Sequence, residues 1–317
     1  MKNRDLPPRC YWKNGAYWHV RRNKWTRLGK TWAAAGREYE RLERLGDGGL
    51  DEIIDLLLTD AAESCKASTL SQYRTAGDKI RAAFAEFRPD QVKPTDVAQF
   101  MQANRSIPNM ANRMRTVLKM AFDKAVLLGI APTNPVTSVP RLKEKKRTRY
   151  ITDQEYRAIQ AKAAPLLAAV IEVCLLTGQR IGDVLKMRRT DLDEVGIFVE
   201  QEKTGARLRI GWSKGLREAV AQAKALAGVV KGIYLLGNSR GGKVSYYTIR
   251  DQWDKATAAA GVEDAHLHDL RAKAGTDTKA GGGDSKALLG HKSESSHARY
   301  LRGLEIPVVE ATRRKAS

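Results

Sequence analysis

Cysteine is scarce in this chain, and its distribution excludes two common kinds of small, cross-linked fold. Only three cysteines occur among 317 residues: Cys10, Cys65 and Cys174. An odd number spread so widely supports neither a disulfide framework nor a zinc site with paired cysteine ligands. The pattern is typical of a protein that works in a reducing cytoplasm.

Long apolar runs are missing as well. No stretch of about 18 apolar residues predicts a membrane span, and the basic start MKNRDLPPRCYW lacks the apolar centre of a secretory signal. With 42% hydrophobic residues the chain can still bury real cores, and 317 residues are expected to form two or three domains. We therefore expect a multidomain protein that does not enter a membrane.

Acidic residues are few relative to basic ones. Lys and Arg number 56 against 36 Asp and Glu, which gives a formal net charge of +20 and a pI near 9.9. Such a balance predicts a polyanionic partner, with nucleic acid as the first candidate and an anionic membrane surface as the second.

The positive charge is densest in the first 30 residues, where nine Lys or Arg accompany a single acid, Asp5. Asn14-Gly15 between two aromatic-rich runs predicts a β-hairpin, followed by a third strand at 24–29 and a helix at 32–45. A small sheet with cations on one face can read a DNA groove; it can also be a protein-binding cap or a sheet with solvated charges. The DNA-binding candidates in this segment are Arg21, Arg22, Lys24 and Arg27.

After a Gly-rich linker at 46–49, the pattern becomes helical. Helices are expected at 51–65, 69–87, 95–104 and 109–128. This unit carries no catalytic constellation, and its charges, including Arg113, either follow DNA phosphate or are solvated.

A second linker, 130–149, contains three prolines and a basic run. Six of the nine residues from 141 to 149 are Lys or Arg. A basic segment beside a bound duplex gains affinity from counterion release, although most charge runs are simply solvated. The DNA-binding candidates here are Lys145, Lys146 and Arg147.

The remaining sequence alternates helices and strands irregularly, without βαβ repeats. Thr152 and Glu155 form a capping box, an apolar helix is expected at 165–176, and a new helix follows the Thr-Gly break and extends through Met187. The other expected elements are strands at 196–201, 206–211 and 233–236, with helices at 213–227 and 245–260.

Two motifs in this region point to other chemistry only weakly. Residues 237–243, GNSRGGK, match the first seven positions of a phosphate-binding P-loop, but Val244 stands where a magnesium-binding hydroxyl is needed. His266 and His268 alternate as they would along a strand and suggest a metal, yet no cluster of Cys or carboxylates completes four ligands. We expect neither ATP nor a metal.

The stretch 288–302, LLGHKSESSHARYLR, places Tyr300 between Arg299 and Arg302. A free phenol has a pKa of about 10, so only about 0.1% is ionised at neutral pH. Neighbouring cations lower that pKa and favour an anionic nucleophile. The alternative is an aromatic residue on an amphipathic helix whose charges are solvated, and this stretch alone favours that alternative.

Four other segments change the balance. They are Arg180 after the Thr-Gly break, Lys203 on a hairpin turn, His268 with Arg271, and His291 after Gly290. On a helix, His268 and Arg271 would share a face because they are three residues apart.

In this order and spacing the segments resemble the tyrosine recombinases, the integrase family of DNA breaking and joining enzymes. TGQRIGDVLKM is similar to the family's first arginine box, HDLR to its His-x-x-Arg box, and LLGHKSESSHARYLR to its nucleophile box. The resemblance covers about residues 150–302. More loosely, the basic start resembles the arm-binding domain of lambda-type phage integrases, and 48–143 resembles their helical core-binding domain.

The resemblance implies a multidomain, mainly α fold with small β-sheets. The implied domains are an arm-type DNA-binding domain at 1–47, with a three-stranded sheet and a helix, and a helical core-binding domain at 48–143. An α+β catalytic domain would follow at 144–317.

The resemblance also implies a role for each site residue. Tyr300 would attack a scissile phosphate to form a 3′-phosphotyrosine link, and Arg180 and Arg271 would hold the non-bridging oxygens. Lys203, with Lys214 as the fallback, would be the general acid for the leaving 5′-oxygen. The remaining roles are proton shuttle for His268, hydrogen-bond donor to the phosphate for His291, and orienting carboxylate for Asp183.

The chain departs from the family pattern at two further places. Many relatives have Glu where Asp183 stands, which makes its orienting role less secure. Ala272-Lys273 replaces the usual His-Thr or Arg-Thr pair, which puts the neighbouring contacts in doubt.

The function that follows is site-specific recombination of phage or prophage attachment sites, without cofactor, metal or ATP. Alternatives within the class are a chromosome-dimer resolvase and a transposon integrase; outside it, a repressor or architectural DNA-binding protein. The implied partners are double-stranded DNA at core and arm sites, three further copies in a tetramer on DNA with 303–317 docked on a neighbour, a host bending protein and an excisionase. The implied location is the bacterial cytoplasm, at the nucleoid.

Overall fold

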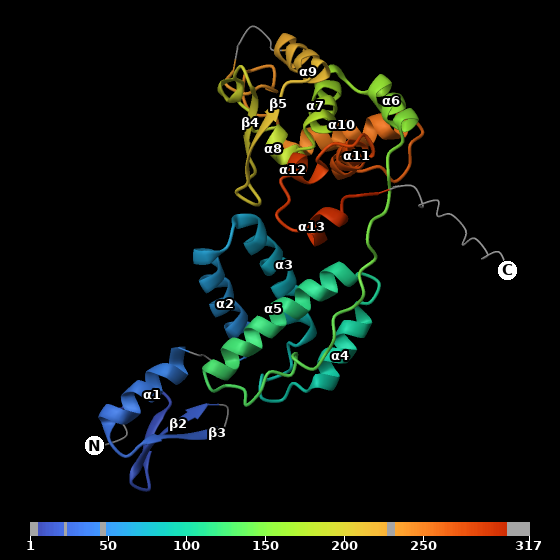
Figure 1. Ribbon diagram of the computed structural model, residues 1–317. Coiled ribbons are helices and arrows are strands. Elements are labelled where there is room, and N and C mark those ends of the chain that lie inside the picture. Colours follow the sequence, from blue (N-terminus) through green and yellow to red (C-terminus); the bar gives the residue numbers. More distant parts are fainter. Residues whose placement is uncertain (1–5, 22–23, 45–48, 227–231, 303–317) are drawn as a thin grey trace, which may run out of the picture. The chain divides into compact units, whose positions relative to one another are not determined.

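The computed structural model describes residues 6–21, 24–44, 49–226 and 232–302 (Figure 1). It divides into two compact units, 1–145 and 146–317. Buried apolar side chains form three separate cores in the described ranges: one under the N-terminal sheet, one among the following helices, and one in the C-terminal unit. The fold is mainly helical with small β-sheets, as predicted. The domain limits at 47/48 and 143/144 stay predictions.

The N-terminal sheet has three antiparallel strands: β1 (Cys10–Lys13), β2 (Ala16–Arg21) and β3 (Lys24–Gly29). Asn14 and Gly15 both have positive φ, 50° and 72°, as a tight two-residue hairpin turn requires. Helix α1 (Trp32–Arg44) covers one face, where Cys10, Tyr17 and Leu28 are buried.

The other face of this sheet carries a cluster of aromatic rings. The Trp25 ring lies 5.8 Å from Tyr11 and 6.4 Å from Trp18, centroid to centroid, and Lys13 Nζ lies 4.8 Å from its centre. Trp25 is 46% exposed, so this face offers stacking surfaces and a cation to a partner.

The next helices are α2 (Leu50–Ser64), α3 (Ala67–Ala83), α4 (Pro94–Ala103) and α5 (Pro108–Leu127). They enclose a core in which alanine and valine are the most frequent buried residues, together with isoleucine and leucine. The chain after α5 packs back on this core: Arg115 donates to the carbonyls of Val136 and Val139 at 3.0 and 2.7 Å, and the Asn112 side-chain amide bonds both backbone groups of Leu142. The first part of the second linker is therefore an ordered part of this unit.

The C-terminal unit is built around one apolar helix, α7 (Pro165–Thr177), seen in Figure 1 among its neighbours. The elements that surround it are α6 (Asp153–Lys162), α8 (Ile181–Val184), α9 (Lys214–Ala225), α10 (Tyr246–Ala259), α11 (Leu267–Ala280), α12 (Ser285–Leu289), α13 (Glu294–Ala298) and the hairpin β4 (Gly196–Glu200) and β5 (Arg207–Gly211). The capping box at Thr152 and Glu155 is confirmed, with reciprocal hydrogen bonds of 3.2 and 2.9 Å.

Three expectations for this unit are wrong. First, residues 233–236 form no strand. Tyr234 makes one isolated bridge to Arg188, and the segment that follows Arg188 turns away from it in a 3-10 helix at Arg189–Asp191. The helix expected to reach Met187 ends at Val184. His266 caps α11 and His268 lies in its first turn, so these two histidines do not alternate along a strand.

The P-loop-like segment is a closed turn. Gly237 pairs with Lys243, and the amides of Arg240 and Gly242 both donate to Asn238 Oδ1, at 3.0 and 2.9 Å. A phosphate cradle needs such amides free, and here Asn238 occupies them. This geometry agrees with the absence of the magnesium-binding hydroxyl.

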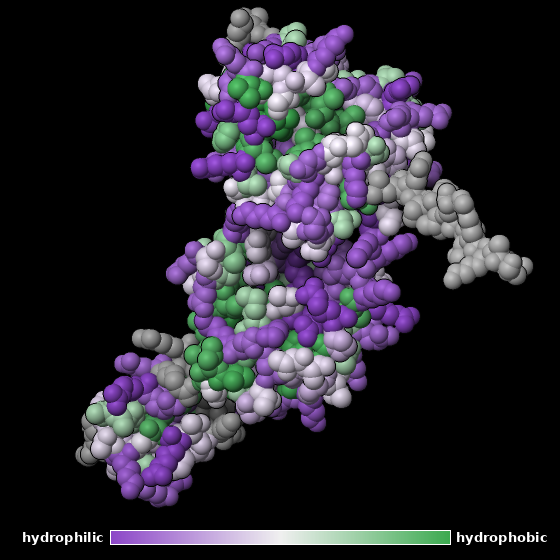
Figure 2. All heavy atoms as spheres, in the orientation of Figure 1, coloured by the Kyte–Doolittle hydropathy of each residue, from purple (hydrophilic) through white to green (hydrophobic). Residues whose placement is uncertain are grey.

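Neither a cluster of metal ligands nor a membrane-spanning helix occurs in the described ranges. They contain no group of three or more His, Cys, Asp and Glu side chains placed to hold a metal ion. Every helix in them is too short or too polar to cross a bilayer. In Figure 2 hydrophilic side chains line the edges of the C-terminal unit, and apolar side chains show between them.

Candidate active site

The C-terminal unit gathers the predicted site residues around one cavity of about 590 Å³. Five of them line it: Arg180, Lys203, His268, His291 and Tyr300. The sixth, Arg271, is 1% exposed and contacts the ring of Tyr300, with Cζ 5.3 Å from the ring centre. Residues separated by up to 120 positions thus meet in one place.

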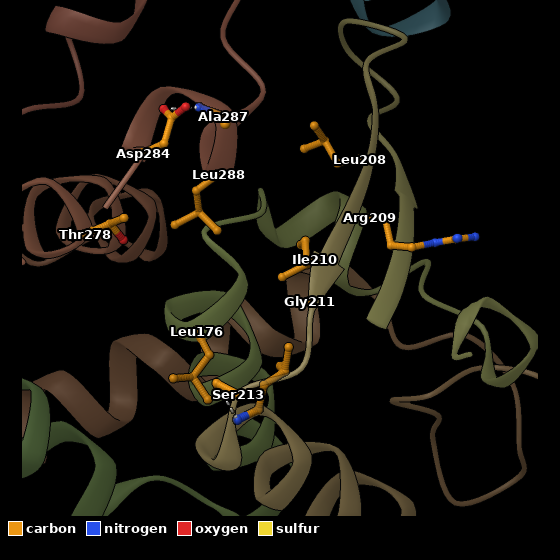
Figure 3. A pocket seen from close by; sticks show the side chains of 11 residues that line it. Leu176, Leu208, Arg209, Ile210, Gly211, Ser213, Thr278, Asp284, Ala287 and Leu288 are labelled. Carbon is orange, nitrogen blue, oxygen red and sulfur yellow. Dashed lines mark hydrogen bonds between the residues drawn. The ribbon is translucent and has the colours of Figure 1, made fainter. Parts of the chain in front are cut away.

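A second hollow, of about 430 Å³, has a different character (Figure 3). Its walls are mainly aliphatic, with Leu176, Ile210 and Leu288 among them. Its acid, Asp284, accepts from the amide of Ala287 as the cap of α12, and the guanidinium of Arg209 pairs with Asp193. No set of polar groups converges there, so we exclude it as the reaction site.

Glycines with positive φ place two of the cavity residues. Gly178 ends α7 with φ 65°, and Arg180 then caps α8. Gly290 ends α12 with φ 62°, and a Cβ there would lie 2.8 Å from Gln201 Nε2. Only glycine allows both the positive φ and the close approach of Gln201 at position 290. The chain can therefore turn there, which places His291 at the cavity.

The nucleophile candidate is held by two histidines. His268 Nε2 lies 3.1 Å from Tyr300 Oη, a distance that permits direct proton transfer. The His291 ring lies 4.7 Å from the Tyr300 ring, centroid to centroid. Both arginines beside Tyr300 in sequence line the cavity, and the guanidinium of Arg302 also binds Asp269.

Arg271 is fixed by the scaffold itself. Nη1 donates to the carbonyl of Gly178 at 2.7 Å and Nη2 to that of Leu289 at 2.5 Å, while Nη2 also lies 3.2 Å from His291 Nε2. Burial and the charge of Arg180 lower the pKa of Arg271 to about 10, so it stays protonated at neutral pH. Its buried Nε has no hydrogen-bond partner among the described residues.

Arg180 is oriented by a buried pair of glutamines. Its Nη1 donates to Gln201 Oε1 at 2.8 Å, and Gln201 Nε2 donates to Gln179 Oε1 at 2.8 Å and to the Leu289 carbonyl at 3.0 Å. Gln201 is completely buried. Neither glutamine was predicted, because a Gln beside a motif has no distinguishing sequence signal.

Asp183 connects Arg180 to the hairpin turn. Its Oδ1 accepts from the Glu202 amide at 3.0 Å, and its Oδ2 lies 3.8 Å from Arg180 Nη1. The shorter Asp therefore reaches both groups in this chain. Because Glu202 precedes Lys203, this contact also positions the turn that carries the candidate general acid. Lys203 is exposed at the cavity, whereas Lys214 lies at the start of α9 and does not line it.

A buried histidine that the sequence did not reveal supports His291. Because Arg271 can only donate, His291 Nε2 must accept from it, which leaves the proton on Nδ1. His291 Nδ1 lies 3.4 Å from His297 Nδ1, and His297 Nε2 lies 3.0 Å from Ser285 Oγ. The contacts form one chain from Arg271 through His291 and His297 to Ser285, in which His297 holds the tautomer and tilt of His291.

Both cavity histidines have a low pKa. Desolvation, followed by the charges of Arg271 and Arg302, lowers the pKa of His268 to about 4. Since the His268 side chain is partly open to solvent, the nearby guanidinium charges are the better-founded cause. Desolvation and Arg271 likewise lower the pKa of His291 to about 4. Both rings are therefore neutral at neutral pH and can accept a proton.

We expect the imidazole resonances of His268 and His291 in the DNA-free protein to show no protonation above about pH 5.5, in contrast to an ordinary histidine with a pKa of about 6.5. Titration by NMR, with His→Gln variants for assignment and the urea-unfolded chain as the control, measures this. Because the folded pKa is below the unfolded one, the unfolded chain binds more protons, so these rings lower the free energy of unfolding as pH falls from about 6.5 to 4. A midpoint near 6.5 in the folded protein would contradict the low pKa.

The predicted DNA-binding residues have different surroundings. Arg27, Lys145 and Lys146 are exposed, and Arg113 is half-buried on α5. The side chains of Arg21, Arg22 and Lys24 lie outside the described residues.

Arg147 has carboxylate partners within its own unit. Its guanidinium donates to Asp269 and Asp264, at 2.7–2.9 Å for the shortest bond to each oxygen. These bonds give Arg147 a structural role, and its contact with DNA stays a prediction.

Lys273, which departs from the family pattern, lies on a face of α11 that is away from the cavity. It is 1% exposed and pairs with Asp277 at 2.9 Å, with Asp153, and with the hydroxyl of Tyr150 at 3.1 Å. The replacement of the family's usual residue thus serves contacts with the start of this unit, outside the cavity.

The comparisons with known proteins agree with this geometry. Residues 144–305 match the model of the phage integrase family. The chain is 28% identical to the integrase of Escherichia phage HK022 over 352 aligned positions, which cover 98% of this chain and 97% of that protein. A lambda integrase dimer bound to a COC′ core site has 24% identity and a TM-score of 0.76, covering 98% of this chain and 100% of that one. A second structure, residues 75–356 of lambda integrase as a dimer on the same kind of site, has 25% identity and a TM-score of 0.73, covering 83% and 98%.

Proposed function

The chain belongs to the phage integrase family, and from that premise we propose how it cuts and rejoins DNA at attachment sites. It is a tyrosine site-specific recombinase that acts through a covalent 3′-phosphotyrosine intermediate. The observation that carries the mechanism is the 3.1 Å contact between Tyr300 Oη and His268 Nε2, beside Arg180 and Arg271.

In the first step Tyr300 Oη attacks the scissile phosphorus while its proton passes to the neutral His268 Nε2. The new bond joins Oη to phosphorus, and the bond from phosphorus to the 5′-oxygen breaks. Lys203 supplies the proton that the 5′-oxygen takes up. The phosphodiester energy stays in the phosphotyrosine link, so a 5′-hydroxyl from another strand reverses the step without ATP.

Arg180, Arg271 and His291 stabilise the negative charge that develops on the non-bridging phosphate oxygens. Two guanidinium groups that stay charged and are already oriented by the scaffold stabilise such a transition state without reorganisation. His291 donates to the phosphate after its Nε2 is protonated or its ring turns from Arg271, since that nitrogen accepts in the DNA-free arrangement.

The match to the HK022 integrase includes the N-terminal sheet, because it covers 98% of the chain. This favours an attachment-site integrase over a resolvase or a transposon integrase. We propose that the exposed face with Tyr11, Trp18 and Trp25 contacts arm-type DNA, that Lys145 and Lys146 contact core DNA, and that four copies assemble on the paired sites. A host bending protein and an excisionase would be additional partners, and the bacterial nucleoid the place of action.

Incubation with a nicked suicide duplex tests the proposal. The duplex carries the repeated core sequence that flanks the coding frame, and the buffer contains EDTA. We expect a protein–DNA adduct that survives SDS, because a short cleaved strand diffuses away and its 5′-hydroxyl can no longer reverse the reaction. Binding in a gel without any adduct would favour the alternative of a repressor or architectural protein.

A further inference from the structure

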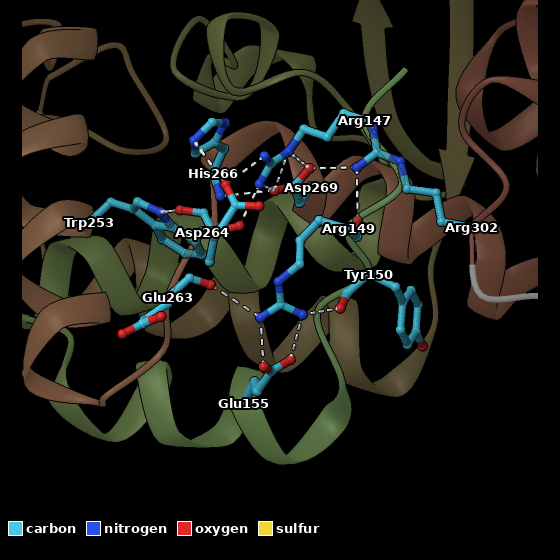
Figure 4. Close-up of polar contacts among 11 residues, drawn as sticks. Arg147, Arg149, Tyr150, Glu155, Trp253, Glu263, Asp264, His266, Asp269 and Arg302 are labelled. Carbon is cyan, nitrogen blue, oxygen red and sulfur yellow. Dashed lines mark hydrogen bonds and ion pairs between the residues drawn. The ribbon is translucent and has the colours of Figure 1, made fainter. Parts of the chain in front are cut away.

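One buried carboxylate joins three segments of the C-terminal unit. Asp269, which follows His268, is completely buried. Arg147 donates to it from Nε and Nη2 at 2.9 and 2.7 Å, Arg302 from Nη1 at 2.5 Å, and the amide of His266 at 2.9 Å. Figure 4 shows the two guanidinium groups converging on this carboxylate.

Arg302 fastens the segment that carries the nucleophile. It lies two residues after Tyr300, and its side chain is 8% exposed. Its amide donates to Thr276 Oγ1 at 2.9 Å, and that hydroxyl donates to the Tyr300 carbonyl at 3.5 Å. The backbone of 300–302 is thus attached to α11, the helix that also carries His268 and Arg271.

Residues 147–149, which lead into α6, contact the same carboxylate and Arg302. Arg302 Nη1 donates to the carbonyl of Arg149 at 2.9 Å, and Arg147 shares Asp269 with Arg302. Burial alone would raise the pKa of Asp269, but the hydrogen bonds from Arg147 and the His266 amide outweigh it and lower the pKa. The carboxylate is therefore charged, and its loss would leave the buried Arg302 guanidinium uncompensated.

We propose that Asp269 is a positioning residue for the cleavage step: through Arg302 it holds Tyr300 Oη against His268, and through Arg147 it ties that alignment to the incoming linker. The role rests on the proposed function. The phosphate-binding groups Arg180 and Arg271 have their own supports in Gln201, Gly178 and Leu289. Asp269 therefore matters for attack by Tyr300 and much less for stabilisation of the phosphate.

Cleavage and joining can be measured separately. Cleavage is the single-turnover rate of adduct formation on the suicide duplex. Joining is measured in a Tyr300→Phe background, on a half-site whose 3′-phosphate carries p-nitrophenol; a 5′-hydroxyl strand displaces p-nitrophenolate, which is followed by its colour. This reaction needs the phosphate site but no tyrosine nucleophile.

In the full chain, Asp269→Asn should slow cleavage about 100-fold, the cost of misplacing a reacting group by about 1 Å. Added to Tyr300→Phe, it should change joining less than about threefold, and DNA affinity should stay unchanged. Asp264→Asn is the matched control, because Asp264 accepts from Arg147 at 2.8 Å but does not contact the nucleophile segment. It should leave both rates at the unmodified level.

Three results would overturn the role. Cleavage by Asp269→Asn at the normal rate would show that the alignment does not depend on this carboxylate. Parallel loss of cleavage and joining would show a general effect on the site or fold, and an equal defect in Asp264→Asn would assign the effect to Arg147 alone. If Asp269→Asn does not fold, Thr276→Val provides a second test, because it removes the hydroxyl that fastens 300–302 without leaving a charge uncompensated. Slower cleavage with unchanged joining would then support the alignment of Tyr300, and normal cleavage would contradict it.

The same measurements distinguish a failure of the positioning role from a failure of the proposed enzyme function. An unmodified chain that binds the duplex and forms no adduct overturns the proposed function and the role built on it. An unmodified chain that forms the adduct at the same rate as Asp269→Asn overturns only the role.

Discussion

Tyr300→Phe should bind the attachment-site duplex as tightly as the unmodified chain and form no covalent complex, with a loss of cleavage on the order of 10⁴–10⁶-fold. Phe keeps the ring that packs 4.7 Å from His291 and 5.3 Å from Arg271 Cζ. Only Oη is lost, together with its 3.1 Å contact to His268. The measurement is a denaturing gel of the suicide-substrate reaction, with affinity from a native gel.

Tyr247→Phe provides the control for this prediction. Tyr247 belongs to the same unit and is 78% exposed, so its change should leave the adduct intact. Mass spectrometry of the unmodified adduct should place the nucleotide on the peptide that contains Tyr300. An adduct formed by Tyr300→Phe would mean that another side chain attacks the phosphate.

Arg271→Lys should lower the cleavage rate by about 10²–10³-fold, the usual loss when one preorganised donor at a developing charge is removed. The same change should lower the free energy of unfolding by about 2 kcal/mol, because a buried carbonyl loses its donor. A guanidinium can bond Gly178 and Leu289 at once and still present its remaining edge to a phosphate. A lysine ammonium is a compact point charge and cannot do all three.

Single-turnover cleavage and urea unfolding measure the two effects. Arg299→Lys is the matched change: Arg299 is exposed at the rim of the same cavity, and we expect less than about a threefold change in rate and less than about 0.5 kcal/mol in stability. If Arg271→Lys cleaves DNA within tenfold of the unmodified rate, the phosphate is held chiefly by other groups.

Local signals predicted most of the elements. The Asn-Gly pair, the Thr152–Glu155 capping box and the apolar run of α7 each encode a structure that short-range contacts decide. The strand expected at 233–236 shows the limit, because a short apolar run becomes a strand only if a partner chain runs alongside it. The segment at Arg188 forms one bridge with Tyr234 and then turns away.

The resemblance to family motifs predicted which residues would meet at the cavity, whereas it did not predict the residues that support them. Gln201, His297 and Asp269 owe their roles to approaches between distant segments, such as the contact of Gln201 with Leu289. The same holds for Arg147, whose place in a basic run predicted DNA contact while Asp269 lay 122 positions away in sequence. Charge in a sequence shows what a residue can bind, and the tertiary fold decides which partner it finds.

The linker between the two compact units has a further consequence. Glu144 accepts from Asn112 at 2.7 Å, and Arg147 is held by Asp269. Lys145 and Lys146 are the residues between these anchors, and the three steps from Glu144 to Arg147 span about 10 Å when extended. So short a tether makes capture of DNA by the second unit an intramolecular event, with an effective concentration on the order of millimolar once the first unit has bound. Two units that each bind DNA weakly would therefore give the whole chain high avidity.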